Sequence, residues 1–233
     1  MRGRTRRLHF VMVTLVVTLL SAWFGASLPG VVLGQSVDPT VFFDGFEPYP
    51  VGIFAPTRGW QVITSSLVDA NISEVHAYGG AKSLLLKDAT ALRIFGLQPW
   101  PVGYSIAIYA DGVGQGAFEV MLVNKDGFLG TNPECGYCGW MIVWFESLNR
   151  TIWVGDGNHM RTCGSWAPGA WYVVKVAPDP LTNTFDVWIN NTLTGQNLGV
   201  YWPHDELIDA IYLHSGANVD VYFDSVTVFL VAP

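Results

Sequence analysis

The chain has 233 residues and a mass of 25.6 kDa, which is enough for one large domain or two small ones. Half of the residues are hydrophobic and only 13% are charged, a composition that excludes disorder over most of the chain. The 25 glycines and the 14% of aromatic residues favour sheets joined by many turns over a helical bundle.

The charge is strongly asymmetric along the chain. The only charged residues among the first 34 are basic: Arg2, Arg4, Arg6 and Arg7. A chain that starts at Gln35 keeps 8 of the 12 basic residues against 19 acidic ones, a net charge of −11. Phosphate backbones and anionic membrane surfaces require clusters of Lys and Arg, which the chain from Gln35 onward does not contain. The sequence therefore predicts no nucleic-acid partner.

The N-terminal segment predicts export. Residues 1–7 are basic, residues 8–24 form a mostly apolar run, and a weaker apolar stretch continues to Gly34. This is the layout of a secretory signal peptide over residues 1–34. The apolar span of about 25 residues is also long enough to cross a bilayer as a helix, so an uncleaved membrane anchor is the alternative. Both predict an extracellular or cell-surface location.

Residues 35–40 are predicted to be a short linker, and residues 41–233 a single all-β domain. Strand signals recur along this domain, separated by turn-forming Asn, Asp, Gly and Pro. We expect strands over 83–86, 104–110, 116–124, 140–146, 151–155, 171–176, 184–189, 209–214 and 219–231.

Alternating hydrophobicity assigns faces to these strands. In residues 184–190, Phe185, Val187 and Ile189 share one face, opposite a more polar one. Residues 171–176 are largely apolar on both faces, which predicts a strand in the middle of a sheet. Two stacked antiparallel sheets satisfy both patterns.

Several short segments resemble a known superfamily. They are the opening FFDGFE (42–47), Trp60, GGAKSL (79–84), PGAWY (168–172), FDVWIN (185–190) and the closing VYFDSV (221–226). In this order they are similar to the concanavalin A-like lectin/glucanase superfamily in its laminin-G-like form, over about residues 41–230. The resemblance implies an antiparallel two-sheet jelly-roll sandwich with one concave and one convex sheet. Members of the superfamily include glycosidases, sugar-binding proteins and adhesion proteins.

The resemblance does not extend to a catalytic motif. The glucanases of the superfamily carry Glu-x-Asp-x-x-Glu on one concave strand, where the carboxylates flank a glycosidic bond. No such triple occurs here. The densest acidic cluster, Asp205, Glu206 and Asp209, follows Pro203 and is typical of a solvated turn. We therefore predict a domain that is not an enzyme.

Aromatic side chains carry the prediction of a sugar site. Sugars present flat apolar patches ringed by hydroxyls, so lectin sites pair aromatic rings with polar side chains. Trp188 shares its strand face with Asp186 and Asn190, which makes these three the best candidates. The alternative is that each tryptophan fills the core of the sandwich.

Two further candidates come from other strands. Trp144 is expected to share a face with Trp140, and Tyr212 shares a face with His214. Trp144 and Tyr212 are therefore added to the candidate ligand-binding residues.

These observations favour a secreted or cell-surface, non-catalytic, lectin-like domain that binds a polysaccharide or glycan. The alternative is a structural or adhesive surface or filament protein without a small ligand, whose partners are copies of itself or other surface proteins. A glycoside hydrolase is the class that the residues favour least.

The three cysteines leave two alternatives open. An exported protein is expected to form one disulfide, joining Cys135 or Cys138 to Cys163. The spacing of Cys135 and Cys138, with His159 and Cys163 further on, also resembles a zinc site.

Three tripeptides fit the acceptor pattern for N-glycosylation, at Asn71, Asn149 and Asn190. Asn149 and Asn190 fall in predicted turns, where a glycan could be attached.

The resemblance also implies a structural calcium ion between the two ends of the domain. By position, Glu47 of the opening segment and Asp224 of the closing segment match the ligands, with Asp44 as a third. Backbone carbonyls near Gly80 and Lys82 are additional candidates. Calcium requires six to eight oxygen ligands, which carboxylates and loop carbonyls can supply.

Overall fold

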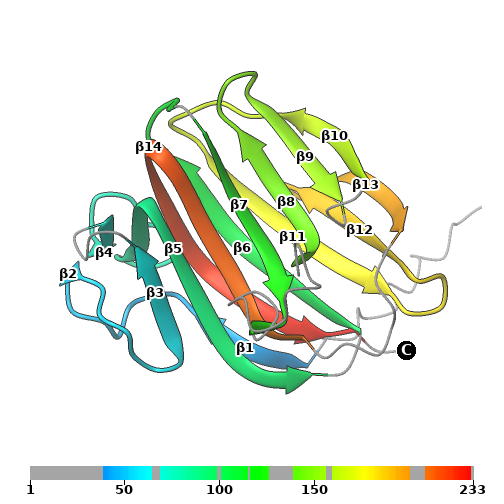
Figure 1. Ribbon diagram of the computed structural model, residues 1–233, viewed down its shortest axis with the longest axis horizontal. Coiled ribbons are helices and arrows are strands. Elements are labelled where there is room, and N and C mark those ends of the chain that lie inside the picture. Colours follow the sequence, from blue (N-terminus) through cyan, green and yellow to red (C-terminus); the bar gives the residue numbers. More distant parts are fainter. Residues whose placement is uncertain are drawn as a thin grey trace, which may run out of the picture. The chain divides into compact units, whose positions relative to one another are not determined.

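The computed structural model describes residues 39–64, 69–98, 101–114, 116–125, 139–155, 159–199 and 208–231 (Figure 1). The predicted signal segment and most of the predicted linker lie outside these residues, although Thr40 already belongs to the first strand. Within the described ranges, no helix is long and apolar enough to cross a membrane.

All the elements in the described ranges are β-strands, which confirms the all-β prediction. They are β1 (Thr40–Asp44), β2 (Gly52–Ile53), β3 (Trp60–Thr64), β4 (Ala70–Ser73), β5 (Ser83–Gln98), β6 (Val102–Ala110), β7 (Ala117–Val123), β8 (Gly139–Glu146), β9 (Thr151–Gly155), β10 (Met160–Ser165), β11 (Trp171–Asp179), β12 (Thr184–Ile189), β13 (Thr192–Gly199) and β14 (Ile208–Leu230).

Two long strands, β5 and β14, run through both layers of the sandwich. The first part of β14 pairs with the second part of β5 and with β7, and its second part pairs with the first part of β5, with β6 and with β1. The pairing of β14 with β5 shifts between Ser215 and Asp220, opposite Asp88, whose φ is 47°. A bulge bends a strand, which lets this pair of strands pass from one layer to the other here.

We call the two layers the front sheet and the back sheet. The front sheet contains β3, the second part of β5, the first part of β14, and β7 to β10. The back sheet contains β4, the other parts of β5 and β14, β6 and β11 to β13, with β1 and β2 at its margins. Figure 1 shows β7, β8 and β9 side by side in one layer, with β11 and β12 behind them.

The core lies between the sheets and is built as the alternation predicted. Phe185, Val187 and Ile189 of β12 are buried in it. Strand β11 lies between β6 and β12, which confirms that it is central. The first strand runs beside the last, since Phe42 pairs with Val228 in the register of β1 and β14.

One predicted face is wrong. Trp140 is 4% exposed and belongs to the core, whereas Trp144 is 38% exposed on the outer face of the front sheet. The register of β8 on β7 shifts next to Met141, which has a φ of 54°. This extra residue rotates the start of the strand, so the two tryptophans point to opposite sides.

A groove on the front sheet as the candidate functional site

A row of chemically distinct side chains crosses the outer face of the front sheet. The strand registers place Thr90 of β5 opposite His214 of β14, His214 opposite Glu119 of β7, Glu119 opposite Trp144 of β8, and Trp144 opposite Trp153 of β9. Directly opposed residues have Cβ atoms about 4.5–5.5 Å apart, so neighbours in this row can act on one ligand.

A second, apolar row lies beside it on the same face. Tyr212 lies opposite Met121 on one side and Leu92 on the other. These three residues belong to a small apolar cluster that is separate from the main core. The ring of Tyr212 stacks on that of His214 with a centroid distance of 5.9 Å.

Glu119, Trp144 and His214 of the first row line an open groove with a volume of about 430 Å³. It is lined by Gly116, Ala117, Glu119, Ile142, Trp144, Met160, His214 and Gly216. Small residues from β7 and β14 leave the space, while Trp144 and Met160 supply apolar walls. This combination of aromatic wall and polar floor suits a sugar ring.

Glu119 is the ionisable acid of the groove lining. Burial raises its pKa to about 7, and a hydrogen bond with Tyr212 opposes that rise. At neutral pH the carboxyl group is therefore close to half protonated, so it can both donate and accept a hydrogen bond or transfer a proton.

His214 is held next to it as a neutral ring. Its Nδ1 lies 3.0 Å from the hydroxyl oxygen of Thr90. Burial lowers the pKa of His214, against the opposing effect of Asp88. A neutral imidazole offers one donor and one acceptor, so it contributes to the groove without adding a charge.

The structure brings Trp144 and Tyr212 of the predicted ligand-binding residues to this face. Asp186 and Trp188 instead lie on β12 at the outer face of the back sheet, and Asn190 lies in the turn that follows this strand. Asp186 accepts the N–H of Asn197 at 2.8 Å, and Asn190 accepts that of Val173 at 2.8 Å.

Trp188 itself is half-buried, with the ammonium of Lys175 5.6 Å from its ring centroid. Trp188 is therefore not among the buried core residues, which was the alternative considered for each tryptophan. Its predicted part in a sugar site stays a prediction, on a second surface.

Sequence reasoning missed Glu119. The signal was present, since Glu119 interrupts an otherwise apolar strand between the buried Phe118 and Val120. A carboxyl group at the centre of such a strand has to be explained by function or by a partner. The search for a pair of carboxylates on one strand passed over this single one.

A different set of carboxylates lies at the loop between β4 and β5, which we call the clasp loop (residues 74–82). Asp224 accepts the N–H groups of Tyr78 at 2.8 Å and Gly79 at 2.9 Å. Glu47 accepts those of Ala81 at 2.8 Å and Lys82 at 2.9 Å. The clasp loop thereby joins the opening segment to the last strand. The superfamily resemblance had implied that a calcium ion would make this connection.

Gly80 is required in the clasp loop for two reasons. Its φ is +93°, and a Cβ atom there would overlap the carboxylate of Glu47. The Lys82 ammonium also donates to the carbonyl oxygens of Glu47 at 3.1 Å and Tyr49 at 2.9 Å.

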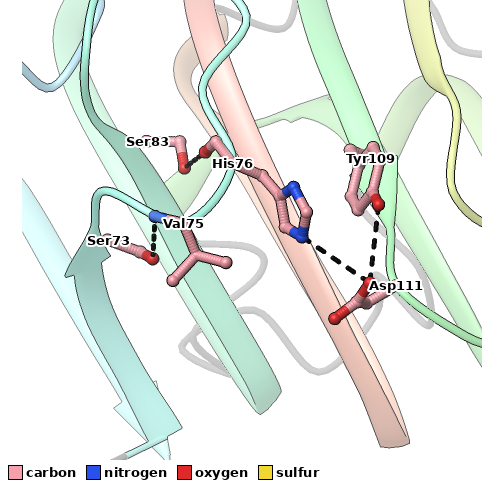
Figure 2. A network of polar contacts seen from close by, with 6 residues as sticks. All are labelled: Ser73, Val75, His76, Ser83, Tyr109 and Asp111. Carbon is pink, nitrogen blue, oxygen red and sulfur yellow. Dashed lines mark hydrogen bonds and ion pairs between the residues drawn. The ribbon is translucent and has the colours of Figure 1, made fainter.

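The clasp loop is anchored on the back sheet by His76, as Figure 2 shows. His76 Nε2 lies 3.6 Å from Asp111 Oδ1, and the His76 ring stacks on Tyr109 with a centroid distance of 4.2 Å. The hydroxyl of Ser83 donates to the carbonyl of His76.

The predicted calcium ligands do not fit a calcium ion as they are arranged. Asp44 accepts the N–H of Phe46, the hydroxyl of Tyr49 and the indole N–H of Trp60, at 2.8, 2.6 and 2.9 Å. Glu47 accepts two N–H groups on Oε1, and Asp224 accepts three N–H groups on its two oxygens. Donors turned towards a carboxylate occupy the lone pairs that a cation would need. No group of three metal-ligating side chains occurs among the described residues.

The cysteine alternatives stay predictions. Cys163 is half-buried on β10, and burial raises the pKa of its thiol. Cys135 and Cys138 lie outside the described residues, so neither the disulfide nor the zinc site is tested.

Of the three glycosylation candidates, Asn149 and Asn190 do lie in hairpin turns. Asn190 and Asn191 have φ values of 50° and 63°, the geometry of a two-residue turn with both central residues left-handed. The side-chain amide of Asn149 donates to Glu146 at 3.2 Å. Asn71 instead lies within β4. Whether any is glycosylated stays a prediction.

The jelly-roll-like β-sandwich described above is shared with solved structures that are 9–14% identical to this chain. A fungal endo-β-1,4-glucuronan lyase from Trichoderma reesei matches it with a TM-score of 0.53 and 14% identity, over 82% of this chain and 96% of that one. The β-glucanase of Bacillus licheniformis matches with a TM-score of 0.52 and 9% identity, over 84% of this chain and all of that one.

A sialidase matches with a TM-score of 0.53 and 10% identity over 74% of this chain, which spans only 17% of the length of that protein. No family model matches the chain, and no curated protein matches it either.

These comparisons correct the prediction that the domain is not an enzyme. A glycosyl hydrolase family 16 protein from Mycobacterium smegmatis also matches, with a TM-score of 0.50 and 14% identity over 82% of this chain and the whole of that one. The solved structures that share the fold include hydrolases and a lyase. The missing Glu-x-Asp-x-x-Glu triple was weak ground for excluding catalysis, because it tests one motif rather than the fold.

Proposed function

We propose that this domain binds a polysaccharide or glycan chain in the groove of the front sheet. The proposal is based on the row of side chains in which Glu119 lies between Trp144 on one side and His214 on the other. An exposed indole supplies the flat apolar surface, and the carboxyl and imidazole groups supply hydrogen bonds to hydroxyls. The fold shared with glucan-active and glucuronan-active proteins supports this class of ligand.

The groove is preferred to the Trp188 surface because the two surfaces differ in the hydrogen-bonding groups that they offer to a ligand. On β12, Asp186 and Asn190 each use an oxygen to hold a neighbouring backbone N–H. In the groove, Glu119 lines open space next to an aromatic wall. Free hydrogen-bonding capacity beside an apolar ring is the feature that a sugar needs.

A matched pair of variants tests the proposal. After a glycan array has identified a ligand, Trp144→Ala should weaken its affinity about tenfold or more, since a stacked ring is lost. Trp188→Ala removes the same side chain from the other surface and should leave the affinity unchanged. The reverse result would move the site to β12. Failure of the wild-type protein to bind any glycan would favour the structural or adhesive alternative.

Cleavage of the bound glycan is a second candidate function, and the pKa of Glu119 favours it. A carboxyl group with a pKa of about 7 is suited to give its proton to a glycosidic oxygen as the C–O bond breaks. Water would add at the anomeric carbon and return a proton to the carboxylate.

Release of reducing ends from the bound polysaccharide measures this activity. Glu119→Gln should abolish the release, and binding measured in parallel separates lost chemistry from lost affinity. Continued release by the variant would exclude Glu119 as the acid.

A further inference from the structure

The charged and neutral residues that line the groove indicate which glycans the groove accepts. This inference rests on the proposed function. Glu119 sits at the centre of the row, and the other residues lining the groove are Gly, Ala, Ile, Trp, Met and a neutral His. Proteins that bind carboxylate or sulfate groups usually do so with the fork of an Arg or the ammonium of a Lys. The residues that line the groove include neither.

The basic residues of the domain all lie outside the groove lining. From residue 35 onward the chain has eight Lys and Arg residues, all in the ranges that the structure describes: Arg58, Lys82, Lys87, Arg93, Lys125, Arg150, Arg161 and Lys175. None of them lines the groove.

Several of these cations are engaged elsewhere. Lys82 donates to the clasp, Lys87 pairs with Asp220 at 3.2 Å, and Lys175 lies over Trp188. Lys125 lies 3.8 Å from Asp209.

The two cations nearest in sequence to groove residues also lie off the lining. Arg161 follows Met160 on β10 and interacts with Cys163, on the other face of that strand. Arg150 lies in the turn between β8 and β9, outside the groove lining.

We propose that the groove selects uncharged glycans, and that Glu119 is the residue that rejects sugars bearing a carboxylate or sulfate group. A second anion beside the ionised carboxyl group would be repelled, and partial burial weakens the screening of that repulsion by salt. A hydroxyl-rich neutral sugar meets no such barrier and can accept from or donate to Glu119.

The selectivity should depend on pH. Burial raises the pKa of Glu119 to about 7, so the discrimination is strongest at pH 8 and declines as the group is protonated. The groups that face Glu119 are Tyr212 and His214 on β14 and Trp144 on β8, with Glu146 one row away on β8 and Asp88 beyond His214 on β5. These include no cation that would reverse the sign.

The test compares one polymer in two charge states. The neutral polysaccharide that binds best is oxidised at its primary hydroxyls to the corresponding uronate, so that the backbone linkage is kept. At pH 8 we expect the neutral form to bind at least tenfold more tightly. Glu119→Gln should reduce this ratio severalfold.

A charge-gain pair gives a second readout. Met160→Lys places an ammonium in the groove lining and should improve binding of the oxidised polymer at least tenfold. Leu148→Lys adds the same charge at a turn position that is 83% exposed, and it controls for the change in net charge. Equal effects of the two variants would mean that the net charge of the domain, −11 from residue 35 onward, and not the groove, sets the selectivity.

The outcomes separate this inference from the proposed function. Tighter binding of the oxidised polymer, or a ratio unchanged by Glu119→Gln, would overturn the inference while leaving glycan binding in the groove intact. If neither form binds and Trp144→Ala therefore has no effect to measure, the proposed function itself fails.

Discussion

Glu47 in the clasp and Glu119 in the groove are two glutamates of one sandwich in opposite surroundings. Glu47 accepts two backbone N–H groups, and the bond from Lys82 is the main reason that its pKa is lowered. Glu119 is partly buried with a hydrogen bond from Tyr212, and its pKa is raised. Backbone donors fix the first carboxylate in a structural role, whereas the second keeps bonding capacity for a ligand.

The largest expected effect is on the structural side of this comparison. Asp224 is fully buried and accepts the N–H groups of Tyr78, Gly79 and Ser225. Asp224→Ala leaves these donors unsatisfied and should lower the free energy of unfolding by about 3–4 kcal/mol in urea titrations.

Asp179 provides the control, since it also accepts hydrogen bonds but lies at the end of β11, next to the turn that leads to β12, and is not fully buried. Asp179→Ala should lower the free energy of unfolding by less than about 1 kcal/mol. Similar losses for both variants would show that the clasp has no special weight.

The next effect is on the groove side and depends on pH. The pKa of Glu119 in the folded state, about 7, lies above the ordinary value of 4.5. Folding therefore favours the protonated form, and its stabilisation is full below pH 4.5 and is lost as the pH rises through 7. At pH 8 Glu119→Gln should be more stable than the wild type by about 2–3 kcal/mol, and near pH 4.5 the difference should vanish.

Chemical denaturation of both proteins from pH 4.5 to 8 measures this difference. Taking the difference cancels the contribution of His214, whose lowered pKa acts in both proteins. Parallel curves over the whole range would show that the pKa of Glu119 is not raised in the folded protein.

Glu47→Gln should give a change of opposite sign. The lowered pKa of Glu47 means that its stabilisation is present above pH 4.5 and is lost as the pH falls through the folded-state value. The variant should therefore be less stable than the wild type at pH 7, and the gap should close in acid. A more stable Glu47→Gln protein at pH 7 would remove the contrast between the two glutamates.

The sequence predicted the frame of this fold because alternation is a local signal. The strands Thr151–Gly155 and Thr184–Ile189 match the predicted ranges residue for residue. The edge strands β10 and β13 were missed, because Met160–Ser165 and Thr192–Gly199 are rich in Gly, Ser and Thr and carry little hydrophobic alternation.

The candidate site was only half predictable. The aromatic residues Trp144 and Tyr212 were found from the predicted faces of their strands, but their place next to Glu119 and His214 depends on register. Register is set by bulges, and those at Met141 and Asp88 have no distinctive residue to announce them. The strand register that places Glu119 opposite Trp144 could therefore not be predicted from the positions of these two residues in the sequence.

The smallest expected effect is that of calcium on stability. A measurable effect would directly contradict the clasp as described here. The oxygens of Glu47 and Asp224 already accept N–H groups, and the ammonium of Lys82 is bound to the carbonyls of Glu47 and Tyr49. We therefore expect identical melting curves in calcium and in chelator, on protein first stripped of metal. Lys82→Met, which removes the built-in cation, should lower the free energy of unfolding by about 1 kcal/mol. A calcium-dependent rise in melting temperature that Asp224→Ala abolishes would instead show that an ion, and not Lys82, joins the two ends of the domain.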